Sequence, residues 1–168
     1  MKLNVEKNIL LKSLSHVQGI VEKRNTLPVL SNILLEAKEN SLILSATDMD
    51  ISITDKLNCN ILEEGSTTVS AQTLYDIIRK LPDSSEIEII SNDGKLISLR
   101  AGKSKFSLGC LPKEDFPIIE IGDLENELNI DSQIFLKLIN KTRFAVSNEE
   151  TRYFLNGIYL HYKNYNNT

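Results

Sequence analysis

The sequence has few of the residues on which most enzyme sites and disulfide-stabilised folds depend. Its 168 residues include seven glycines, two cysteines, two histidines and no tryptophan. The glycines form no phosphate-binding loop, and no Walker or nucleophile-elbow motif occurs. Cys59 and Cys110 lack metal-ligand or redox spacing, so we expect two reduced thiols in a cytoplasmic protein.

Long apolar runs are also missing. No stretch approaches the roughly 18 consecutive apolar residues that a membrane span needs, and no apolar core follows the basic start. The hydrophobic content of 41% and charged content of 25% are ordinary for a globular protein. We therefore expect a soluble protein that binds no membrane, with a length that allows one full domain and part of another.

Negative charge is in modest excess, but it is unevenly distributed. The net charge of −4 argues, taken alone, against binding to nucleic acid. Segments 6–24, 70–80 and 131–143 together carry +5, whereas the rest of the chain carries −9. One surface could therefore attract a polyanion although the whole chain is acidic. The alternative is that these lysines and arginines simply occupy solvated helix faces.

A short strand that leads directly into an amphipathic helix occurs three times, starting at Val5, Val69 and Ile130. In each copy a branched apolar residue is followed by a polar or acidic residue at the cap position. Apolar residues then recur at helical spacing. The repeat indicates that one supersecondary module is reused, although any α+β chain contains several helix starts.

The predicted fold is α+β, with strand, helix and three strands occurring twice. Pro28 forbids continuation of the first helix and Pro82 stops the second, and residues 92–94 predict a hairpin turn because Asn, Asp and Gly accept positive φ angles. Strands are predicted at residues 2–6, 30–36, 41–47, 50–57, 67–69, 86–90, 95–100 and 104–108, and helices at 7–22 and 71–81.

We predict a first domain at residues 1–122. It comprises modules 1–64 and 65–110 and a linker, 111–122, that contains two prolines. In each module the helix must cover one sheet face, so two modules side by side would place their helices on one face of curved antiparallel sheets. This arrangement would bring the basic segments onto one surface.

A third module begins after this domain with a predicted strand at 127–130 and a helix at 132–143. Only one clear strand, at 154–163, is predicted after the helix. We therefore expect residues 123–168 to form an incomplete second domain.

Candidate catalytic side chains are few. Asp48 and Asp50 could begin a Mg²⁺ or Ca²⁺ site, but no further acidic cluster completes it. Cys110 could be a nucleophile, but no neighbour in sequence activates it. His16 and His161 have no partner pattern. We expect no catalysis, no metal and no cofactor, and keep an enzyme using Asp48, Asp50 or Cys110 as an alternative.

Two clusters are candidates for binding. Arg152 precedes Tyr153 and Phe154, and such a group can hold a phosphate and stack on a base, or can rest on core aromatics instead. No base-reading motif occurs, so any DNA binding should be independent of sequence. Residues 103–108 alternate like a strand; at a sheet edge they would either invite a partner strand or, through their lysines, block one.

Five segments in order resemble the N-terminal part of the bacterial DNA polymerase III beta subunit, the replicative sliding clamp. They are RNTLPVLSNILL at 24–35, LSATDMD at 44–50, GKSKFSL at 102–108, LPKEDFP at 111–117 and RYFLNGI at 152–158. The resemblance implies clamp domains of two modules each, with helices that line a pore. Family subunits carry three such domains, and two subunits close a ring.

The resemblance also implies a function. The ring encircles duplex DNA, slides along it and tethers the replicative polymerase, and a clamp loader places it there. It is a processivity factor for DNA replication and not an enzyme. Basic helices facing the pore hold DNA weakly, and we expect Lys12, Arg79, Lys137 and Lys141 to belong to this basic helix face.

Single residues carry over from the family. DNA contact is implied for Arg24, Tyr153 and Phe154, although the last is commonly tyrosine in the family. Gln72 stands where some members have arginine, and Glu149 where some have glutamine. Both changes remove attraction for phosphate.

Phe106 and Leu108 match the strand that pairs across the ring interface, where Lys103 and Lys105 would meet acidic residues of the other subunit. The family interface joins the first domain of one subunit to the third of another, so this chain carries one half of it.

Arg152 and Leu155 match the near edge of the groove that binds polymerase and loader peptides. Two interpretations therefore remain open. The chain is a truncated part of a clamp, or it is a stand-alone regulatory or vestigial protein that binds clamp subunits and cannot close a ring.

Overall fold

The computed structural model describes residues 1–21, 27–92, 94–119 and 128–163. The chain divides into two compact units, Met1–Glu120 and Ile121–Thr168. The domain boundary predicted between residues 122 and 123 lies outside the described residues.

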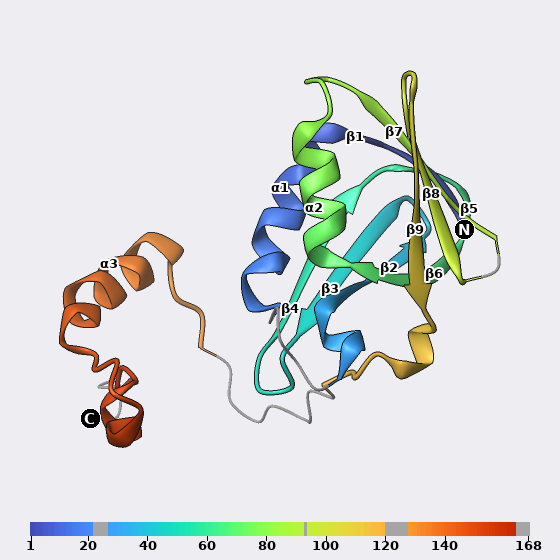
Figure 1. Ribbon diagram of the computed structural model, residues 1–168. Helices are drawn as coiled ribbons and strands as arrows, with labels where there is room; N and C mark the ends of the chain where they lie inside the picture. The colour runs from blue at the N-terminus through green and yellow to red at the C-terminus, as the bar shows by residue number, and fades with distance from the viewer. Residues whose placement is uncertain (22–26, 93, 120–127, 164–168) are drawn as a thin grey trace. The chain divides into compact units, whose positions relative to one another are not determined.

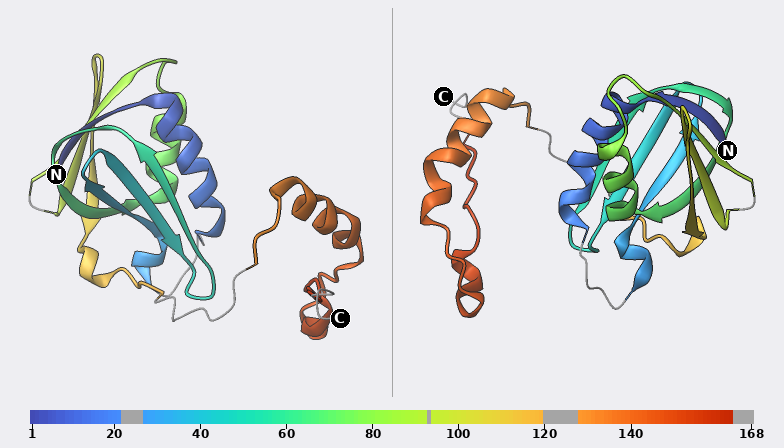
Figure 2. Two further views of the ribbon diagram at one scale, coloured as in Figure 1. Left: turned by 180° about the vertical axis from the view of Figure 1, so that it is seen from behind. Right: turned by 45° about the horizontal axis from the view of Figure 1, so that its top comes forward.

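The first unit is an antiparallel sheet with two α-helices packed side by side on one face (Figures 1 and 2). The helices are α1 (Lys7–Val17) and α2 (Ala71–Lys80), and the strands are β1 (Lys2–Glu6), β2 (Asn32–Lys38), β3 (Ser41–Thr47), β4 (Ser52–Asn58), β5 (Asn60–Glu63), β6 (Gly65–Ser70), β7 (Glu86–Ser91), β8 (Leu96–Ala101) and β9 (Ser104–Leu111). The strand order is β4-β3-β2-β6-β9-β8-β7-β1-β5. The predicted α+β fold class is confirmed.

Apolar spacing along each helix explains its packing. In α1, Leu10, Leu14 and Val17 recur on one helical face and are buried, and Leu74 and Ile78 do the same in α2. These side chains meet the inward-facing apolar residues of the strands in one core cluster. Burying this apolar surface is the dominant stabilising term for the unit.

Helix α1 is shorter than the predicted helix at 7–22. It ends at Val17 and continues as a 3₁₀ turn, Gln18–Ile20, after which Val21 is extended. Gly19 lies inside this turn, and glycine costs about 1 kcal/mol relative to alanine in an α-helix. The apolar periodicity of the sequence thus continues beyond Val17, although the α-helix ends there.

Several strands also differ from the prediction. A 3₁₀ turn, Pro28–Ser31 (η2), replaces the start of the strand predicted at 30–36, and β2 begins at Asn32. Strand β6 spans Gly65–Ser70 instead of 67–69. Strand β5 was not predicted; it is a four-residue strand that pairs with β1, placing Leu3 opposite Ile61.

Strand β9 joins the two halves of the sheet through a short contact. It pairs with β8 from Ser104 to Gly109, whereas on its other side only Cys110 and Leu111 pair with β6. Among the described residues, no strand pairs with the second edge of β9 between Ser104 and Gly109. The middle of the sheet thus carries an open strand segment.

The second unit contains helix α3 (Ser132–Thr142) and the 3₁₀ turns η4 (Arg143–Ala145) and η5 (Glu150–Leu155). The Asp131 carboxylate caps α3 by accepting hydrogen bonds from the backbone N–H groups of Gln133 and Ile134, at 3.0 and 3.1 Å. Where exposure is described in residues 128–163, no residue is buried. The helix is therefore fixed by local bonds more than by burial.

The strand predicted at 154–163 is wrong. Residues up to Leu155 form turn η5, and residues 158–163 have no strand conformation. A strand needs a neighbour to satisfy its backbone groups, and the described residues of this unit offer none. Residues 128–130 of the strand predicted at 127–130 are likewise not a strand, and residue 127 lies outside the described residues.

The two units repeat one local structure. Helix α1 and its 3₁₀ turn recur as α3 and η4, with equal lengths, at an interval of 125 residues counted from Lys7 to Ser132. At the same interval, Leu27 and Leu30 correspond to Arg152 and Leu155.

Candidate functional site

The exposed faces of α1 and α2 carry the predicted cations, but these differ in their surroundings. Lys12 is exposed, and no carboxylate in the described part of the chain forms an ion pair with it. The Arg79 guanidinium lies 3.3 Å from the Asp76 carboxylate and 5.7 Å from the centroid of the Tyr75 ring. The charge of Arg79 is thus partly offset, whereas that of Lys12 is available to an anion.

Gln72 lies on the same helix face as Arg79. Its side-chain amide donates a 2.8 Å hydrogen bond to the other carboxylate oxygen of Asp76. Asp76 therefore holds both Gln72 and Arg79, so these two predicted contact residues and one acid form a single polar group.

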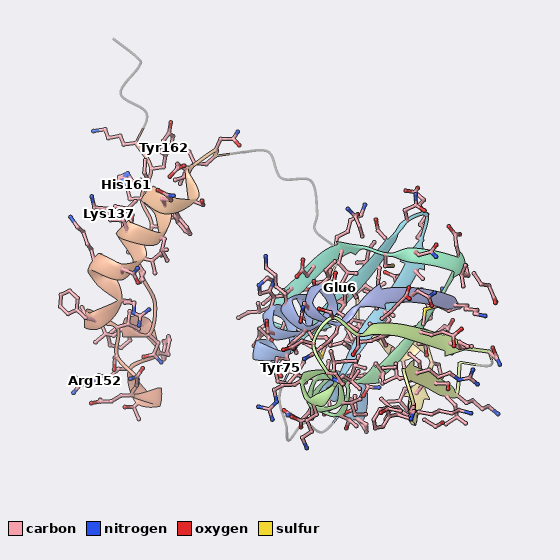
Figure 3. All side chains as sticks on the ribbon, turned by 90° about the horizontal axis from the view of Figure 1, so that it is seen from above. Glu6, Tyr75, Lys137, Arg152, His161 and Tyr162 are labelled. Carbon is pink, nitrogen blue, oxygen red and sulfur yellow. The ribbon has the colours of Figure 1, made fainter. Side chains whose placement is uncertain are left out.

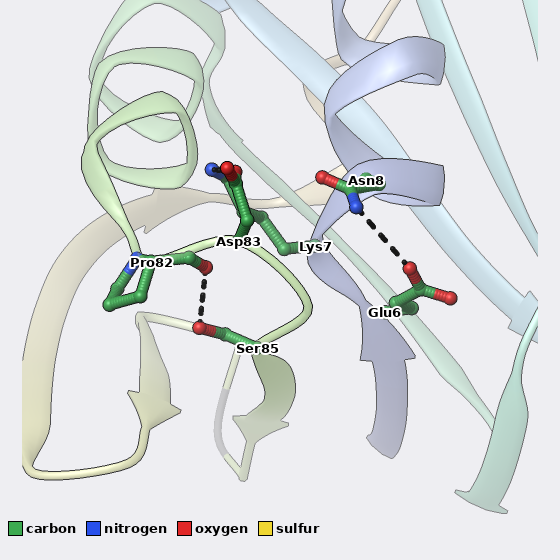
Figure 4. A network of polar contacts seen from close by, with 6 residues as sticks. All are labelled: Glu6, Lys7, Asn8, Pro82, Asp83 and Ser85. Carbon is green, nitrogen blue, oxygen red and sulfur yellow. Dashed lines mark hydrogen bonds and ion pairs between the residues drawn. The ribbon is translucent and has the colours of Figure 1, made fainter.

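Lys7, which counts toward the positive charge of the first helical segment, is not on the exposed face. Its side chain is turned inward and its ammonium lies 2.7 Å from the Asp83 carboxylate (Figure 4). Glu6 and Asn8 pair beside it, and the Ser85 hydroxyl donates to the Pro82 carbonyl at 2.6 Å. The positive charge estimated from composition therefore overstates what α1 presents to solvent.

His16, at the far end of α1, pairs with a strand. Its Nδ1 atom lies 2.8 Å from the Asp55 carboxylate on β4. Burial alone would raise the pKa of Asp55, but hydrogen bonds from His16 and Ser13 lower it below its ordinary value. This pair ties helix to sheet, and neither side chain has a further catalytic partner among the described residues.

The open segment of β9 separates its side chains by type. Lys105 on this segment and Lys103 in the turn just before it are exposed, whereas Phe106 and Leu108 are half-buried and pack against the core cluster. The segment therefore offers three features at one edge: unpaired backbone groups, apolar side chains on the inner side and lysines on the outer side.

A row of charged residues crosses the outer face beside this segment. Lys105 stands opposite Arg100, which stands opposite Glu88. The Glu88 carboxylate lies 3.8 Å from the Arg100 guanidinium and 3.4 Å from the Lys2 ammonium. Glu88 is thus shared by two cations, and Lys105, which forms no ion pair with a carboxylate in the described part of the chain, adds a positive charge at the end of the row.

The second unit brings four predicted residues together in one turn. Arg152 and Glu149 form an ion pair of 3.1 Å, and the Tyr153 and Phe154 rings meet edge to face with centroids 5.8 Å apart. Both rings are more than two-thirds exposed. An exposed aromatic pair beside an arginine is a surface on which bases or sugars can stack.

Three further predicted residues of this unit are exposed as well. Figure 3 shows Lys137 on α3 and Arg152 in the turn beyond it. Lys141 also lies exposed on α3, and Leu155 is 45% exposed. Arg24, the predicted loop contact, lies outside the described residues.

Of the residues considered for catalysis, Asp48 has a structural role. The Asp48 carboxylate accepts hydrogen bonds from the backbone N–H groups of Asp50 and Ile51, at 3.0 and 2.7 Å, and so holds a tight turn. Cys110 is half-buried between β8 and β6. Among the described residues, no group of three or more histidine, cysteine or acidic side chains could hold a metal ion.

The surfaces above are therefore suited to binding. Within the described part of the chain, no helix is both long and apolar enough to cross a membrane.

Both units match models of known protein domains. Residues 1–120 match the model of the DNA polymerase III beta subunit N-terminal domain. Residues 129–167 match the model of the central domain of the same subunit. The two matches follow each other in the order of the family.

Individual relatives agree with these matches. The beta sliding clamp of Caulobacter vibrioides is 48% identical over 162 residues, and that of Rickettsia felis is 41% identical over 163 residues. These alignments cover 96% and 97% of this chain but only 44% and 43% of the relatives. The chain thus spans less than half the length of the curated relatives it matches.

Solved structures give the same result. A structure described as Caulobacter crescentus pol III beta matches with a TM-score of 0.89 at 48% identity, over 96% of this chain and 44% of that one. A sliding clamp from Bartonella birtlesii, bound to griselimycin, matches with a TM-score of 0.92 at 43% identity, over 96% and 43%. The chain therefore belongs to the DNA polymerase III beta subunit family, the beta sliding clamps.

Proposed function

We propose that this chain acts as the N-terminal part of a replicative sliding clamp. In this function, a non-catalytic ring encircles duplex DNA and keeps the replicative polymerase on its template. The observation that carries the proposal is the pair of helices α1 and α2, which lie side by side on one sheet face in a domain whose relatives are clamps. No cofactor is needed, because the ring acts by topology.

DNA contact through the helices should be weak and independent of sequence. Lys12 and Arg79 on the first unit, and Lys137 and Lys141 on α3, carry the positive charge that attracts phosphates. Such contacts do not read bases, so they permit sliding. The ring, and not the affinity of any single contact, then prevents escape.

The loop and turn residues add contacts to DNA. Arg24 would contact a phosphate, and the exposed rings of Tyr153 and Phe154 would rest against the DNA. Gln72 on the first unit and Glu149 on the second are further proposed DNA-contact positions, but they contribute little attraction. The negative charge of Glu149 also offsets the positive charge of Arg152, with which it forms an ion pair.

Ring closure would use the open segment of β9. A strand of a second subunit could pair with the free edge between Ser104 and Gly109, while Phe106 and Leu108 meet apolar side chains of that subunit. Lys103 and Lys105 would face acidic residues across the interface.

Polymerase and clamp loader peptides would dock against the second unit. Arg152 and Leu155 are both exposed and lie in one turn, where they would form the near edge of a peptide groove. We place this activity in the bacterial cytoplasm, where the thiols of Cys59 and Cys110 stay reduced.

The test uses the protein in the form that its own cells make. An antibody raised against the first unit would recover that protein, and its mass would be measured. The recovered protein would then be loaded with a bacterial clamp loader onto nicked circular duplex DNA and separated from free protein by gel filtration. The DNA would then be linearised by restriction digestion, and release of the protein from it would be measured.

A clamp stays on the circle and is released when the DNA is linearised, because its hold is topological. We expect this result, together with a mass more than twice the 19.0 kDa of this chain. A native protein of 19.0 kDa that is not retained on circles would overturn the proposal. The stand-alone regulatory interpretation would then take its place.

A further inference from the structure

An apolar hollow lies on the first unit beside turn η2. Its volume is about 440 Å³, within the range of sites that hold small ligands and peptide side chains. The residues that line it are Leu27, Pro28, Val29, Met49, Leu111, Asp115 and Pro117. Because these residues come from three separate segments of the chain, the hollow exists only in the folded unit.

The floor of the hollow is buried and apolar, and its rim is apolar and exposed. Val29 belongs to a small buried cluster with Leu30, Leu34 and Phe116. On the rim, Leu27 is 47% exposed and Met49 is 55% exposed. Large apolar side chains held at a concave surface are typical of an interaction site.

The fold fixes Met49 in this position. Its backbone has a φ of 80°, which is uncommon for a residue other than glycine. The Met49 N–H donates to the Thr47 hydroxyl at 3.0 Å, and the Asp48 carboxylate holds the next two backbone N–H groups. The exposed thioether is thus held at the rim by the turn, and methionine adapts well to different apolar partners.

One charged side chain, that of Asp115, lies among the described residues that line the hollow. In sequence, Asp48 and Asp50 flank Met49, and Lys113 lies two residues before Asp115. An occupant that complements this surface carries apolar side chains for the floor and a positive charge for the mouth. We propose that the hollow binds a short extended peptide in which two adjacent apolar residues are flanked by lysine or arginine.

The internal repeat agrees with a peptide as the occupant. Leu27 and Leu30 correspond, at the interval of 125 residues, to Arg152 and Leu155, the proposed edge of the partner-peptide groove. This parallel rests on the proposed function, whereas the size, lining and charge of the hollow do not. The site on the first unit is apolar at Leu27 where the other has an arginine, so the two would prefer different peptides.

The test uses the chain labelled with ¹³C at its methionine methyl groups. The chain has two methionines, and they report separately: Met49 lies on the rim of the hollow, whereas Met1 is buried and packs near Gly65. The probe is the peptide Ala-Lys-Leu-Phe-Lys-Ala. The control peptides are Ala-Glu-Leu-Phe-Glu-Ala and Ala-Lys-Ser-Ser-Lys-Ala.

We expect the lysine-flanked Leu-Phe peptide to shift the Met49 methyl signal in a saturable way and to leave the Met1 signal in place. Leu27→Asp should weaken this binding about tenfold or more, because it places a charge against the apolar peptide side chains. Asp115→Lys should weaken the lysine-flanked peptide and strengthen the glutamate-flanked one. Leu62→Asp, at a similarly exposed leucine on β5, is the matched control and should change nothing.

Three results would overturn the proposal. The first is a Met49 signal that does not move with the lysine-flanked Leu-Phe peptide, or that moves equally with the serine peptide. The second is equal weakening by Leu27→Asp and Leu62→Asp. The third is a shift of the Met49 signal, without peptide, on dilution or on substitution of Ile118, an exposed apolar residue that follows Pro117 in the chain (Ile118→Ser). The occupant would then be a second copy or the chain itself. None of these readings depends on DNA retention.

Discussion

Lys7 and Asp83 connect the two modules of the first unit, with the lysine ammonium 2.7 Å from the carboxylate (Figure 4). Lys7 is the first residue of α1, and Asp83 lies in the turn after α2. The lysine side chain is 6% exposed, whereas the aspartate is 88% exposed. The Lys7 N–H also donates to the Ser85 carbonyl at 2.9 Å, so backbone and side chain fix the same junction.

The pair should make stability depend on pH. The hydrogen bond and the positive charge of Lys7 lower the pKa of Asp83 from its ordinary value. A carboxyl with a lowered folded-state pKa contributes stability that is fully present above its unfolded pKa of about 3.9. That contribution is lost as the pH falls through the folded-state value.

Asp83→Asn should therefore lower the Tm at pH 7, because the buried Lys7 ammonium loses its carboxylate. The difference from the wild type should shrink as the pH falls below about 4, where the unfolded chain takes up a proton at Asp83, and should vanish once the pH lies below the lowered pKa of Asp83 in the folded state. Thermal unfolding between pH 3 and pH 7 measures both effects. Asp50→Asn is the control, and a difference that is as large at pH 3 as at pH 7 would contradict the assignment.

Thr67 and Thr68 are adjacent buried threonines on β6 that differ in the hydrogen bonding of their hydroxyl groups. The Thr68 hydroxyl donates to the Leu111 carbonyl at 2.8 Å and accepts from the Asn32 amide at 3.0 Å. The Thr67 hydroxyl has no hydrogen-bond partner in the part of the chain that the structure describes. Thr68 therefore supports the short contact that joins β6 to β9.

Thr68→Val should destabilise the first unit by about 1–3 kcal/mol, because it leaves the buried amide of Asn32 and the Leu111 carbonyl without their partner. Thr67→Val keeps the same shape and removes an unsatisfied hydroxyl, so it should be neutral or stabilising. Urea unfolding of the two variants gives the comparison. Equal losses in both would mean that packing, and not hydrogen bonding, governs this position.

The helix starts were predictable because their signals are local. In each of the three copies a polar or acidic residue occupies the cap position, and at two of them its side chain caps the helix. Ser70 accepts from the Thr73 N–H at 3.4 Å, and Asp131 accepts two hydrogen bonds. Glu6 makes no such bond. Glutamate is a poor cap. The sequence pattern therefore predicted all three helix starts, but side-chain capping of the helix occurs in only two of them.

Features that depend on distant segments were not predictable from the sequence. From the sequence, Lys7 is predicted to be a surface cation, because Asp83 comes close to it only in the folded chain. Strand β5 has four residues and little periodicity, so only its pairing with β1 defines it. Turn η2 begins at Pro28, which marks a break without specifying the geometry. The hollow has no sequence signal, because Leu27, Met49 and Leu111 meet only in the fold.

Asp131 should matter most for α3, which has little burial to support it. Asp131→Ala should cost the helix about 1 kcal/mol and speed amide hydrogen exchange at Gln133 and Ile134, the two N–H groups that it accepts. Asp131→Asn should behave much like the wild type, because asparagine caps a helix about equally well. If asparagine were as harmful as alanine, charge and not the hydrogen bonds would be the stabilising factor.

The positively charged residues of the helix face should not contribute equally to DNA binding. In a full-length clamp carrying this chain, Lys12→Ala should reduce the dependence of log affinity on log salt by about one, the effect of one lost phosphate contact. Arg79→Ala should have a smaller effect, because Asp76 already offsets that charge at 3.3 Å. Anisotropy of a fluorescent duplex at several KCl concentrations measures both slopes.

Asp76→Asn provides the decisive comparison for Arg79. Removing the carboxylate should strengthen DNA binding, because the guanidinium then carries its full charge on the exposed face. In that background Arg79→Ala should cost as much as Lys12→Ala does in the wild type. If Asp76→Asn leaves the effect of Arg79→Ala unchanged, the ion pair does not limit Arg79, and its stacking on Tyr75 is the better explanation for the weak contact.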